Sequence, residues 1–383
     1  MKKALLLLTG GRGVPDMLVV KYLVKHSHPD VVFNITTEKG LKDAQNFSRF
    51  ALKHFKCKVE VLSPIDPFKE QEIKDRCREA FQCELNAEWI IHFTGSPKVV
   101  GIYAHDLARE RGIPLWFLDT EGKQVVSLIK DCQIDHEELF KASVEEYMGA
   151  YGRTFEKAKD GDYRKEAQSW YPAAQVLANN SETTQALLKA IRSTQSLDIT
   201  IDIQAEQVIQ QLSTLGMLRI KKATSGDLTC KIMGNKRREF LLGDWLEVYV
   251  WQETIKMGFA DDCQWGYKIP VDQKIAATLP SNELDLTLTY QARLLIAECK
   301  TSRDPFDPIY LDKLYAIANL IGGGYVRQVF VTNCPRPPKG KDERFDNFSR
   351  QAAVRRISVI TGERLPEVGT LLQQEIQATG RSH

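Results

Sequence analysis

The segment ELDLTLTYQARLLIAECKT, residues 283–301, contains two apolar stretches on either side of the dipeptide Gln291–Ala292. Each stretch is rich in aliphatic and β-branched side chains, which is typical of strands. If the dipeptide forms a two-residue turn, Asp285 lies directly opposite Glu298, and opposed side chains of this kind are about 4.5–5.5 Å apart at Cβ. We therefore predict a hairpin that brings two carboxylates together, although Gln-Ala lacks the glycine that a tight hairpin turn favours.

This pair of carboxylates favours a metal site. The run Leu294–Ala297 indicates a buried strand, where charges are costly unless they are paired or bound to a metal ion. Two adjacent carboxylates repel each other unless a divalent cation bridges them, and oxygen ligands favour Mg²⁺ or Mn²⁺. We predict that Asp285 and Glu298 are ligands to such an ion. A salt-bridge network on the protein surface is the alternative interpretation.

Two further residues complete the predicted site. Lys300 lies two residues beyond Glu298 and shares its face of the strand, where it would orient a water molecule or stabilise developing negative charge. Glu247 projects from an upstream helix, in the segment Gly243–Glu247, and is the candidate third ligand. Six of the seven histidines precede residue 137, and the seventh is the last residue of the chain. Catalysis in the C-terminal half must therefore proceed without histidine.

The chain as a whole suits two or three domains, since it has 383 residues. In the first ~130 residues, short apolar runs alternate with helical patterns, which predicts a parallel, doubly wound α/β sheet. The predicted strands are Ala4–Leu8, Val31–Ile35, Val59–Leu62, Trp89–Phe93 and Leu115–Leu118. We predict an N-terminal Rossmann-like domain over residues 1–135, a helical linker over residues 136–235 and a C-terminal α/β domain over residues 236–383.

The predicted linker ends in a helix followed by two strands. The helix covers Ala205–Leu212, and the strands cover Met217–Lys222 and Leu228–Ile232. This order is compatible with a winged-helix-like hairpin or with the start of the C-terminal domain. The predicted elements of that domain are a helix at Phe240–Met257, the hairpin, a helix at Leu311–Ile321 and a strand at Val326–Thr332.

Two glycine-containing loops follow strands of the N-terminal domain. Thr9–Gly10–Gly11–Arg12–Gly13 follows the first predicted strand, and Thr94–Gly95–Ser96–Pro97–Lys98 follows the fourth. The carboxyl ends of parallel strands form the usual ligand crevice of such sheets, and free N–H groups at helix starts suit phosphate. Lys98 lies where a phosphate would need a cation. Ordinary glycine turns are the alternative.

The C-terminal segment resembles the PD-(D/E)xK nuclease superfamily. The resemblance rests on an ordered set of motifs: Gly-x-Trp-Leu-Glu at Gly243–Glu247, Glu-Leu-Asp at Glu283–Asp285, Glu-Cys-Lys-Thr at Glu298–Thr301, and a helix that closes on Gly-Gly. It implies a restriction-endonuclease-like fold and metal-dependent cleavage of phosphodiester bonds, with Glu247, Asp285, Glu298 and Lys300 as the catalytic residues and Mg²⁺ or Mn²⁺ as the cofactor.

The N-terminal domain resembles CARF domains, the cyclic oligoadenylate sensors of type III CRISPR systems, because Thr-Gly-x-x-Lys follows its fourth strand. The whole chain is thus similar to the CARF–PD-(D/E)xK ancillary nucleases of antiviral defence. This family implies a homodimer that binds a cyclic oligoadenylate, with the tetra-adenylate as the expected ring. Residues implied to line the ring site are Thr9, Gly10, Gly11, Arg12, Gly13, Thr36, Thr37, Thr94, Gly95, Ser96 and Lys98. The family commonly has Gly-Gly-Thr-Lys where this chain has Gly-Ser-Pro-Lys, which leaves the ring size open.

The leading hypothesis is therefore a cytoplasmic nuclease that cleaves DNA or RNA once it binds a cyclic oligoadenylate. One alternative is a restriction or repair nuclease without such control. The other is a ligand-sensing, DNA-binding regulator that uses Met217–Ile232 as a wing, with Lys221 and Lys222 on phosphates. The apolar start of the chain ends at Thr9, too early for a signal peptide, and no stretch approaches the ~20 apolar residues of a membrane span.

Overall fold

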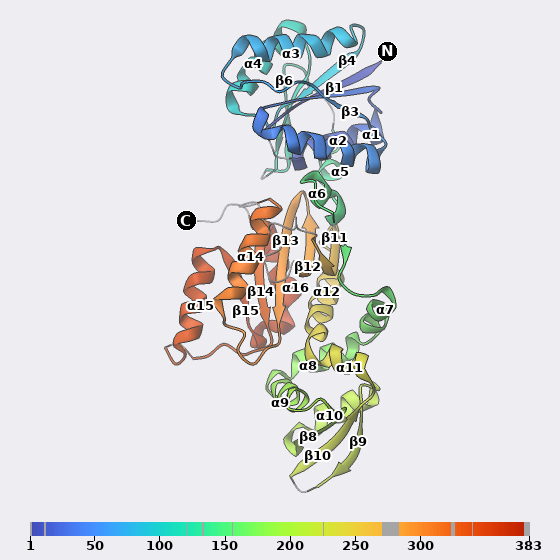
Figure 1. Ribbon diagram of the computed structural model, residues 1–383, viewed down its shortest axis with the longest axis vertical. Coiled ribbons are helices and arrows are strands. Elements are labelled where there is room, and N and C mark those ends of the chain that lie inside the picture. Colours follow the sequence, from blue (N-terminus) through green and yellow to red (C-terminus); the bar gives the residue numbers. More distant parts are fainter. Residues whose placement is uncertain are drawn as a thin grey trace. The chain divides into compact units, whose positions relative to one another are not determined.

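The computed structural model describes residues 2–10, 13–120, 122–131, 134–154, 156–224, 226–269, 283–322, 326–338 and 340–378, except for the side chain of Ile203. The chain divides into two compact units. The first extends to Thr154 and also includes Thr289–Arg293, and the second comprises Phe155–Leu288 and Leu294–Ala378. Figure 1 labels most of their helices and strands.

The first unit contains the predicted Rossmann-like sheet. Its strand order is β3-β2-β1-β4-β5-β6. The strands are β1 (Lys3–Thr9), β2 (Val31–Thr36), β3 (Val59–Val61), β4 (Glu88–His92), β5 (Leu115–Asp119) and β6 (Gln124–Leu128). The first five pair in parallel, which confirms the predicted fold class, whereas β6 is an antiparallel edge strand that the sequence analysis missed. Leu5–Leu8 is completely buried, as expected for a sheet covered on both faces.

Helices connect these strands in the predicted alternation. They are α1 (Gly13–His26), α2 (Leu41–Phe55), α3 (Glu70–Cys83), α4 (Lys98–Arg111) and, after β6, the short α5 (His136–Leu139) and α6 (Val144–Ala150). The start of α1 packs tightly on the end of α6, because a Cβ atom on Gly13 would lie only 2.0 Å from the Ala150 carbonyl oxygen. Gly13 is therefore required by packing within this unit.

The first part of the second unit consists of helices and a small sheet. The elements are β7 (Glu156–Lys157), α7 (Gly161–Ser169), α8 (Tyr171–Asn179), α9 (Ser181–Arg192), β8 (Asp198–Asp202), α10 (Glu206–Thr214), β9 (Leu218–Ala223) and β10 (Asp227–Ile232). The sheet has the order β8-β10-β9, so the predicted helix and hairpin are joined by the unpredicted strand β8. Lys221, a residue of the proposed wing, forms an ion pair with Asp198 at 2.7 Å.

The rest of the second unit is built around a six-stranded sheet with the order β15-β14-β13-β12-β11-β7. Its further strands are β11 (Asp262–Lys268), β12 (Glu283–Tyr290), β13 (Arg293–Lys300), β14 (Val326–Thr332) and β15 (Ile357–Ile360), and its helices are α11 (Asn235–Glu239), α12 (Trp245–Met257), α14 (Pro308–Leu320), α15 (Glu343–Val354) and α16 (Val368–Gln377). Strands β13, β14 and β15 are parallel. Helix α12 packs on α16, and α14 packs on α15.

The hairpin of β12 and β13 has the predicted two-residue turn. Strand β12 ends at Tyr290 and β13 begins at Arg293. Gln291 and Ala292 have φ angles of 46° and 62°, so both residues adopt the left-handed conformation that a type I′ turn requires. The chain thus forms this turn without glycine, at a steric cost of about 1 kcal/mol or more for each residue.

Among the described residues, no helix is both long and apolar enough to cross a bilayer.

The packing at Gly13 can be tested by substitution. Gly13→Ala should lower the free energy of unfolding by about 2 kcal/mol or more, because the new methyl group meets backbone that cannot rotate away. Gly161→Ala is the matched control, since its Cβ would have no atom within 4 Å, and it should leave the unfolding midpoints unchanged or raise one slightly. Chemical denaturation followed by circular dichroism measures both. Equal stabilities of the two variants would contradict the packing described here.

Candidate functional site

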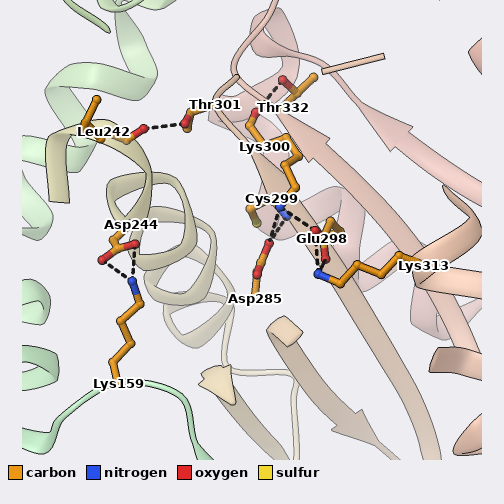
Figure 2. A network of polar contacts seen from close by, with 10 residues as sticks. All are labelled: Lys159, Leu242, Asp244, Asp285, Glu298, Cys299, Lys300, Thr301, Lys313 and Thr332. Atoms are coloured by element: carbon orange, nitrogen blue, oxygen red, sulfur yellow. Dashed lines mark hydrogen bonds and ion pairs between the residues drawn. The ribbon is translucent and has the colours of Figure 1, made fainter. Parts of the chain in front are cut away.

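The hairpin brings the predicted acidic residues to one place. Asp285 and Glu298 are 5% and 1% exposed, and both flank the same ammonium group. Lys300 Nζ lies 2.5 Å from Glu298 Oε1 and 3.8 Å from Asp285 Oδ2, as Figure 2 shows from close by. The same oxygen of Asp285 also accepts a hydrogen bond from within the hairpin, because the backbone N–H of Cys299 donates to Asp285 Oδ2 at 2.7 Å. The alternative interpretation, a salt-bridge network on the protein surface, does not apply, since both carboxylates are buried.

The site contains a second lysine, which the sequence analysis did not identify. Lys313 of α14 donates to both oxygens of Glu298 at 3.0 Å. One turn earlier on the same helix, the ring centroid of Tyr310 lies 5.3 Å from Lys300 Nζ. The signal in the sequence is weak: Lys313 follows another charged residue, Asp312, in a mainly apolar helix, and the pair stands between the buried Leu311 and Leu314.

Glu247 reaches the site from α12. A single π-helical turn, Phe240–Asp244, precedes this helix, and such turns are frequent at functional sites. The predicted helix Phe240–Met257 is thus a π turn followed by an α-helix. Glu247 Oε2 is buried and has no hydrogen-bond partner among the described residues.

The neighbouring acid on the π turn is already neutralised. Lys159 Nζ lies 2.7 Å and 2.8 Å from the two oxygens of Asp244, and the hydroxyl of Tyr163 donates to the same carboxylate at 2.5 Å. Lys159 lies 85 positions before Asp244 in the sequence, so no local pattern could have indicated the pair.

The electrostatics of the site reflect an excess of acids. Burial and the neighbouring Glu298 raise the pKa of Asp285 to about 7. Burial, together with Asp285 and Asp244, raises the pKa of Glu247 well above that of an ordinary glutamate. Burial opposes the charge of Lys300, but Asp285 and Glu298 outweigh it and raise its pKa above the usual value. Asp244, Asp285 and Glu298 each lie against an ammonium group, whereas Glu247 has no ion pair with the described residues.

A divalent cation fits this donor set. Glu247 Oε2 is a buried oxygen without a hydrogen-bond partner among the described residues, and the charge of Asp285 contributes to the raised pKa of Glu247. Carboxylate oxygens are the ligands that Mg²⁺ and Mn²⁺ prefer. In the conformation described, however, no three acidic, histidine or cysteine side chains among the described residues are close enough together to surround an ion.

Hydrogen bonds fix the end of β13 next to Lys300. Thr301 Oγ1 donates to the Leu242 carbonyl oxygen at 2.7 Å, and Thr332 Oγ1 donates to the Lys300 carbonyl oxygen at 2.7 Å. Arg192 adds a bond to the Thr301 carbonyl oxygen at 2.8 Å. The π turn and strands β13 and β14 are therefore tied together where the site lies.

In the first unit, the two predicted loops lie against each other. Strands β1 and β4 are neighbours, and a Cβ atom on Gly10 would lie 2.5 Å from the Gly95 carbonyl oxygen. Thr9 is buried and donates to Asn34 Oδ1 at 2.9 Å, and Thr36 is buried at the end of β2. Gly11 and Arg12 lie outside the described residues.

The other predicted ligand residues have mixed roles. Thr37 caps the 3₁₀ turn Glu38–Gly40, and Thr94 Oγ1 accepts a bond from Leu118 N at 2.7 Å. Ser96 Oγ donates to the Phe93 carbonyl oxygen at 2.8 Å. Lys98 is exposed at the first turn of α4, and it forms no ion pair within 4.0 Å with the described residues.

A layer of buried polar side chains beneath these loops was not predicted. Asn34 and His92 are completely buried within β2 and β4, and Asp16 of α1 is 2% exposed. Asp16 Oδ1 lies 3.3 Å from His92 Nε2, and burial raises the pKa of Asp16. The signal in the sequence is a single polar residue near the end of each of two apolar strands.

The second unit contains the part of the chain that matches a known family. Residues 234–378 match the family described as the Card1-like endonuclease domain. This part of the chain is similar to that endonuclease family, which bears out the predicted nuclease domain. The comparison with curated proteins gave no significant match.

Solved structures share the fold over the whole chain. Can2 from Sulfobacillus thermosulfidooxidans, in complex with cyclic tetra-adenylate, has a TM-score of 0.74 at 18% identity and covers 98% of both chains. Protein VC1899 from Vibrio cholerae has the same TM-score and identity and covers 99% of both chains. A type III CRISPR defence DNA nuclease activated by cyclic oligoadenylate has a TM-score of 0.51 at 15% identity, over 89% of this chain and 47% of its own. The chain thus shares the fold of Can2 and of VC1899 over nearly its full length.

The raised pKa of Asp285 predicts how stability depends on pH without metal. A carboxyl whose pKa is about 7 when folded and about 3.9 when unfolded stabilises the fold fully below pH ~4, and this contribution is lost as the pH rises toward 7. Asp285→Asn prevents this loss of stability, because asparagine does not ionise. At pH 8, the variant should exceed the metal-free wild type by about 1 kcal/mol or more in unfolding free energy.

Thermal or urea unfolding at pH 4 and pH 8, in the presence of a chelator, measures this difference. The two proteins should be closest at pH 4, where both side chains are neutral. Added Mn²⁺ should stabilise the wild type more than the variant, because only the wild type retains the full ligand set. A wild type that is the more stable protein at pH 8 without metal would refute the assignment.

Proposed function

We propose that this protein is a nuclease of type III CRISPR antiviral defence that a cyclic oligoadenylate activates and a divalent metal ion assists. The observation that carries the proposal is the buried group of Asp285, Glu298 and Lys300 inside a Card1-like endonuclease domain. The substrate is DNA, RNA or both. The structural neighbours support the activator, since Can2 was solved with cyclic tetra-adenylate and a further neighbour is described as activated by cyclic oligoadenylate.

In this proposal the three acids bind the metal ion, and the lysine acts on the water molecule and the phosphate. Glu247, Asp285 and Glu298 hold Mg²⁺ or Mn²⁺, which would polarise the scissile phosphate and lower the pKa of a bound water molecule. Lys300 donates hydrogen bonds to that water or to the phosphate oxygens. The water oxygen forms a bond to phosphorus as the bond to the leaving oxygen breaks, and Lys300 stabilises the negative charge that accumulates.

The division of the chain supports control of this site by the first unit. Thr289–Arg293, the tip of the hairpin, belongs to that unit. Within it, Thr289 Oγ1 donates to the Ala142 carbonyl oxygen at 2.6 Å, and Lys123 Nζ lies 4.8 Å from the ring centroid of Tyr290. Asp285 lies only four positions before Thr289 on the same strand. A rearrangement of the first unit would therefore act directly on the strand that carries a proposed ligand.

The ring site in this proposal is formed by the loops after β1 and β4. Thr9, Gly10, Thr94, Gly95, Ser96 and Lys98 line it, with Thr36 and Thr37 at the end of β2 and Gly11, Arg12 and Gly13 completing the first loop. A ring with repeated identical units matches two copies of the same loops, so the active species is a homodimer. The ammonium group of Lys98, which is exposed and has no ion pair with the described residues, is the group that would contact phosphate.

Cleavage assays test the enzyme. Wild-type protein should cut single- or double-stranded DNA or RNA with Mn²⁺ and cyclic tetra-adenylate, and a chelator should stop the reaction. Glu298→Gln and Lys300→Met should each lower the rate by about 100-fold or more, because they remove a metal ligand and the cation beside the phosphate. Lys341→Ala, an exposed lysine of the same unit, should cut at the wild-type rate. Full activity of Glu298→Gln would end the assignment.

The activator site is tested separately from the chemistry. Lys98→Ala should weaken cyclic tetra-adenylate binding by about tenfold or more, measured by calorimetry without nucleic acid, because a phosphate contact is lost. Lys53→Ala, on the exposed end of α2, should bind the ring as the wild type does. Cleavage that is equally fast with and without every ring would instead identify a nuclease that lacks such control.

A further inference from the structure

The buried polar side chains at the strand ends of the first unit include several atoms without a hydrogen-bond partner. Among the described residues, no partner is present for Asp16 Oδ1, Asn34 Nδ2, Thr36 Oγ1 or either ring nitrogen of His92. All four side chains are at most 2% exposed. A buried polar group without a partner is costly and therefore rare. Four such side chains in one unit require an explanation other than packing.

Two of these side chains, Asp16 and His92, lie beneath the loops of the proposed ring site. His92 is the last residue of β4, and Asp16 lies in the first turn of α1. The loops that follow β1 and β4 are in contact, since a Cβ atom on Gly10 would lie 2.5 Å from the Gly95 carbonyl oxygen. Asp16 is thus within about one helical turn, ~5.4 Å, of the start of α1, where a phosphate of the ring would bind.

Asp16 and His92 form a pair that is isolated from other charges. Asp16 Oδ1 lies 3.3 Å from His92 Nε2, and among the described residues His92 is the one ionisable side chain whose charge acts on Asp16. On the neighbouring strands, Leu7 and Trp116 lie beside His92. Helix α1 and the helices packed on it form their ion pairs without Asp16, namely Lys21–Glu146, Lys25–Glu138, His26–Glu138 and His54–Glu145.

The charge of this pair depends on one proton. With a single proton between them, Asp16 and His92 have no net charge, either as an ion pair or as two neutral groups. Burial raises the pKa of Asp16, and His92 opposes this effect. When the proton is lost, a buried carboxylate remains, which is strongly disfavoured.

A bound ring would interact with this carboxylate. The amino end of a helix favours a negative charge, but two negative charges at the same end repel each other. An ionised Asp16 beside a neutral His92 would therefore oppose a phosphate at the start of α1. The same phosphate would favour the state in which the pair keeps its proton.

We propose that Asp16 and His92 share a proton whose uptake is linked to binding of the cyclic oligoadenylate. Both are then positioning residues of the ring site, because they act on the ring through the loops and the start of α1. The sign follows from the charges: the ring favours the protonated pair, so the affinity for the ring falls as the pH rises and the pair loses its proton. This inference rests on the proposed function, since it concerns the same ring site.

Calorimetry with cyclic tetra-adenylate tests this linkage in the full-length protein without nucleic acid. Titrations in buffers of different ionisation enthalpy count the protons taken up, and the Kd is measured from about pH 5.5 to about pH 9. The wild type should take up protons as it binds the ring, and its affinity should fall by about tenfold or more across this range. Asp16→Asn should take up none and should bind with an affinity that does not depend on pH. Asparagine does not ionise, and burial keeps His92 neutral once the carboxylate is gone.

A control and the pH profile separate the linkage from a purely structural role. Asp75→Asn removes an exposed carboxylate of α3 and should take up as many protons as the wild type. A purely structural role of Asp16 predicts that Asp16→Asn binds the ring more weakly at every pH. The linkage predicts instead that this variant binds at least as tightly as the wild type at about pH 9. If Asp16→Asn does not fold, the proton count of the wild type decides the question.

The possible failures are distinguishable. A wild type that binds the ring without proton uptake, and with the same affinity at every pH, would overturn the role of Asp16 and His92 and leave the ring-activated nuclease intact. Proton uptake that persists in Asp16→Asn would also overturn it, because another group would then be responsible. A wild type that binds no cyclic oligoadenylate at any pH would instead contradict the proposed function.

Discussion

The buried carboxylate of Glu298 is the constraint on which the rest of the endonuclease unit depends. A charge in the middle of a sheet strand costs several kcal/mol unless cations compensate it. Two lysines do so here, one from the same strand and one from α14. Strand β13 can therefore be both a central, apolar strand and the carrier of a charged site, and α14 must pack where its lysine reaches Glu298.

The same requirement explains the contacts around the site. Asp244 on the π turn is matched by Lys159, from a segment far away in the sequence, and the strand end at Thr301 is bonded to the carbonyl oxygen of Leu242 on that turn. Each contact fixes one backbone segment relative to another. Together they hold Glu247, whose side chain has no ion pair with the described residues, next to the hairpin that carries Asp285. A rigid supporting network of this kind is what an active site needs in order to position reacting groups.

Sequence reasoning was most successful where a pattern was local. The hairpin followed from strand-forming residues on either side of Gln291–Ala292, and the turn formed there although both residues must adopt positive φ. It missed β6, β7, β8, β11 and β15, and all of these except β11 are short strands at the edge of a sheet. It also missed Lys313 and Lys159, because their partners are 15 and 85 positions away and only the folded chain brings them together. The close packing of Gly13 on Ala150 could not be predicted either, because the two residues are far apart in the sequence.

The charge balance of the site explains why binding of the phosphodiester substrate would require the metal ion. Four carboxylates, those of Asp244, Glu247, Asp285 and Glu298, face three ammonium groups, those of Lys159, Lys300 and Lys313. The pKa of Asp285 near 7 shows how the protein accommodates this excess without an ion, since a proton then takes up the surplus charge. A phosphodiester brings a further negative charge, which the metal-free site would repel. A single divalent cation reverses that balance, because it neutralises the surplus carboxylate and leaves one positive charge for the phosphate.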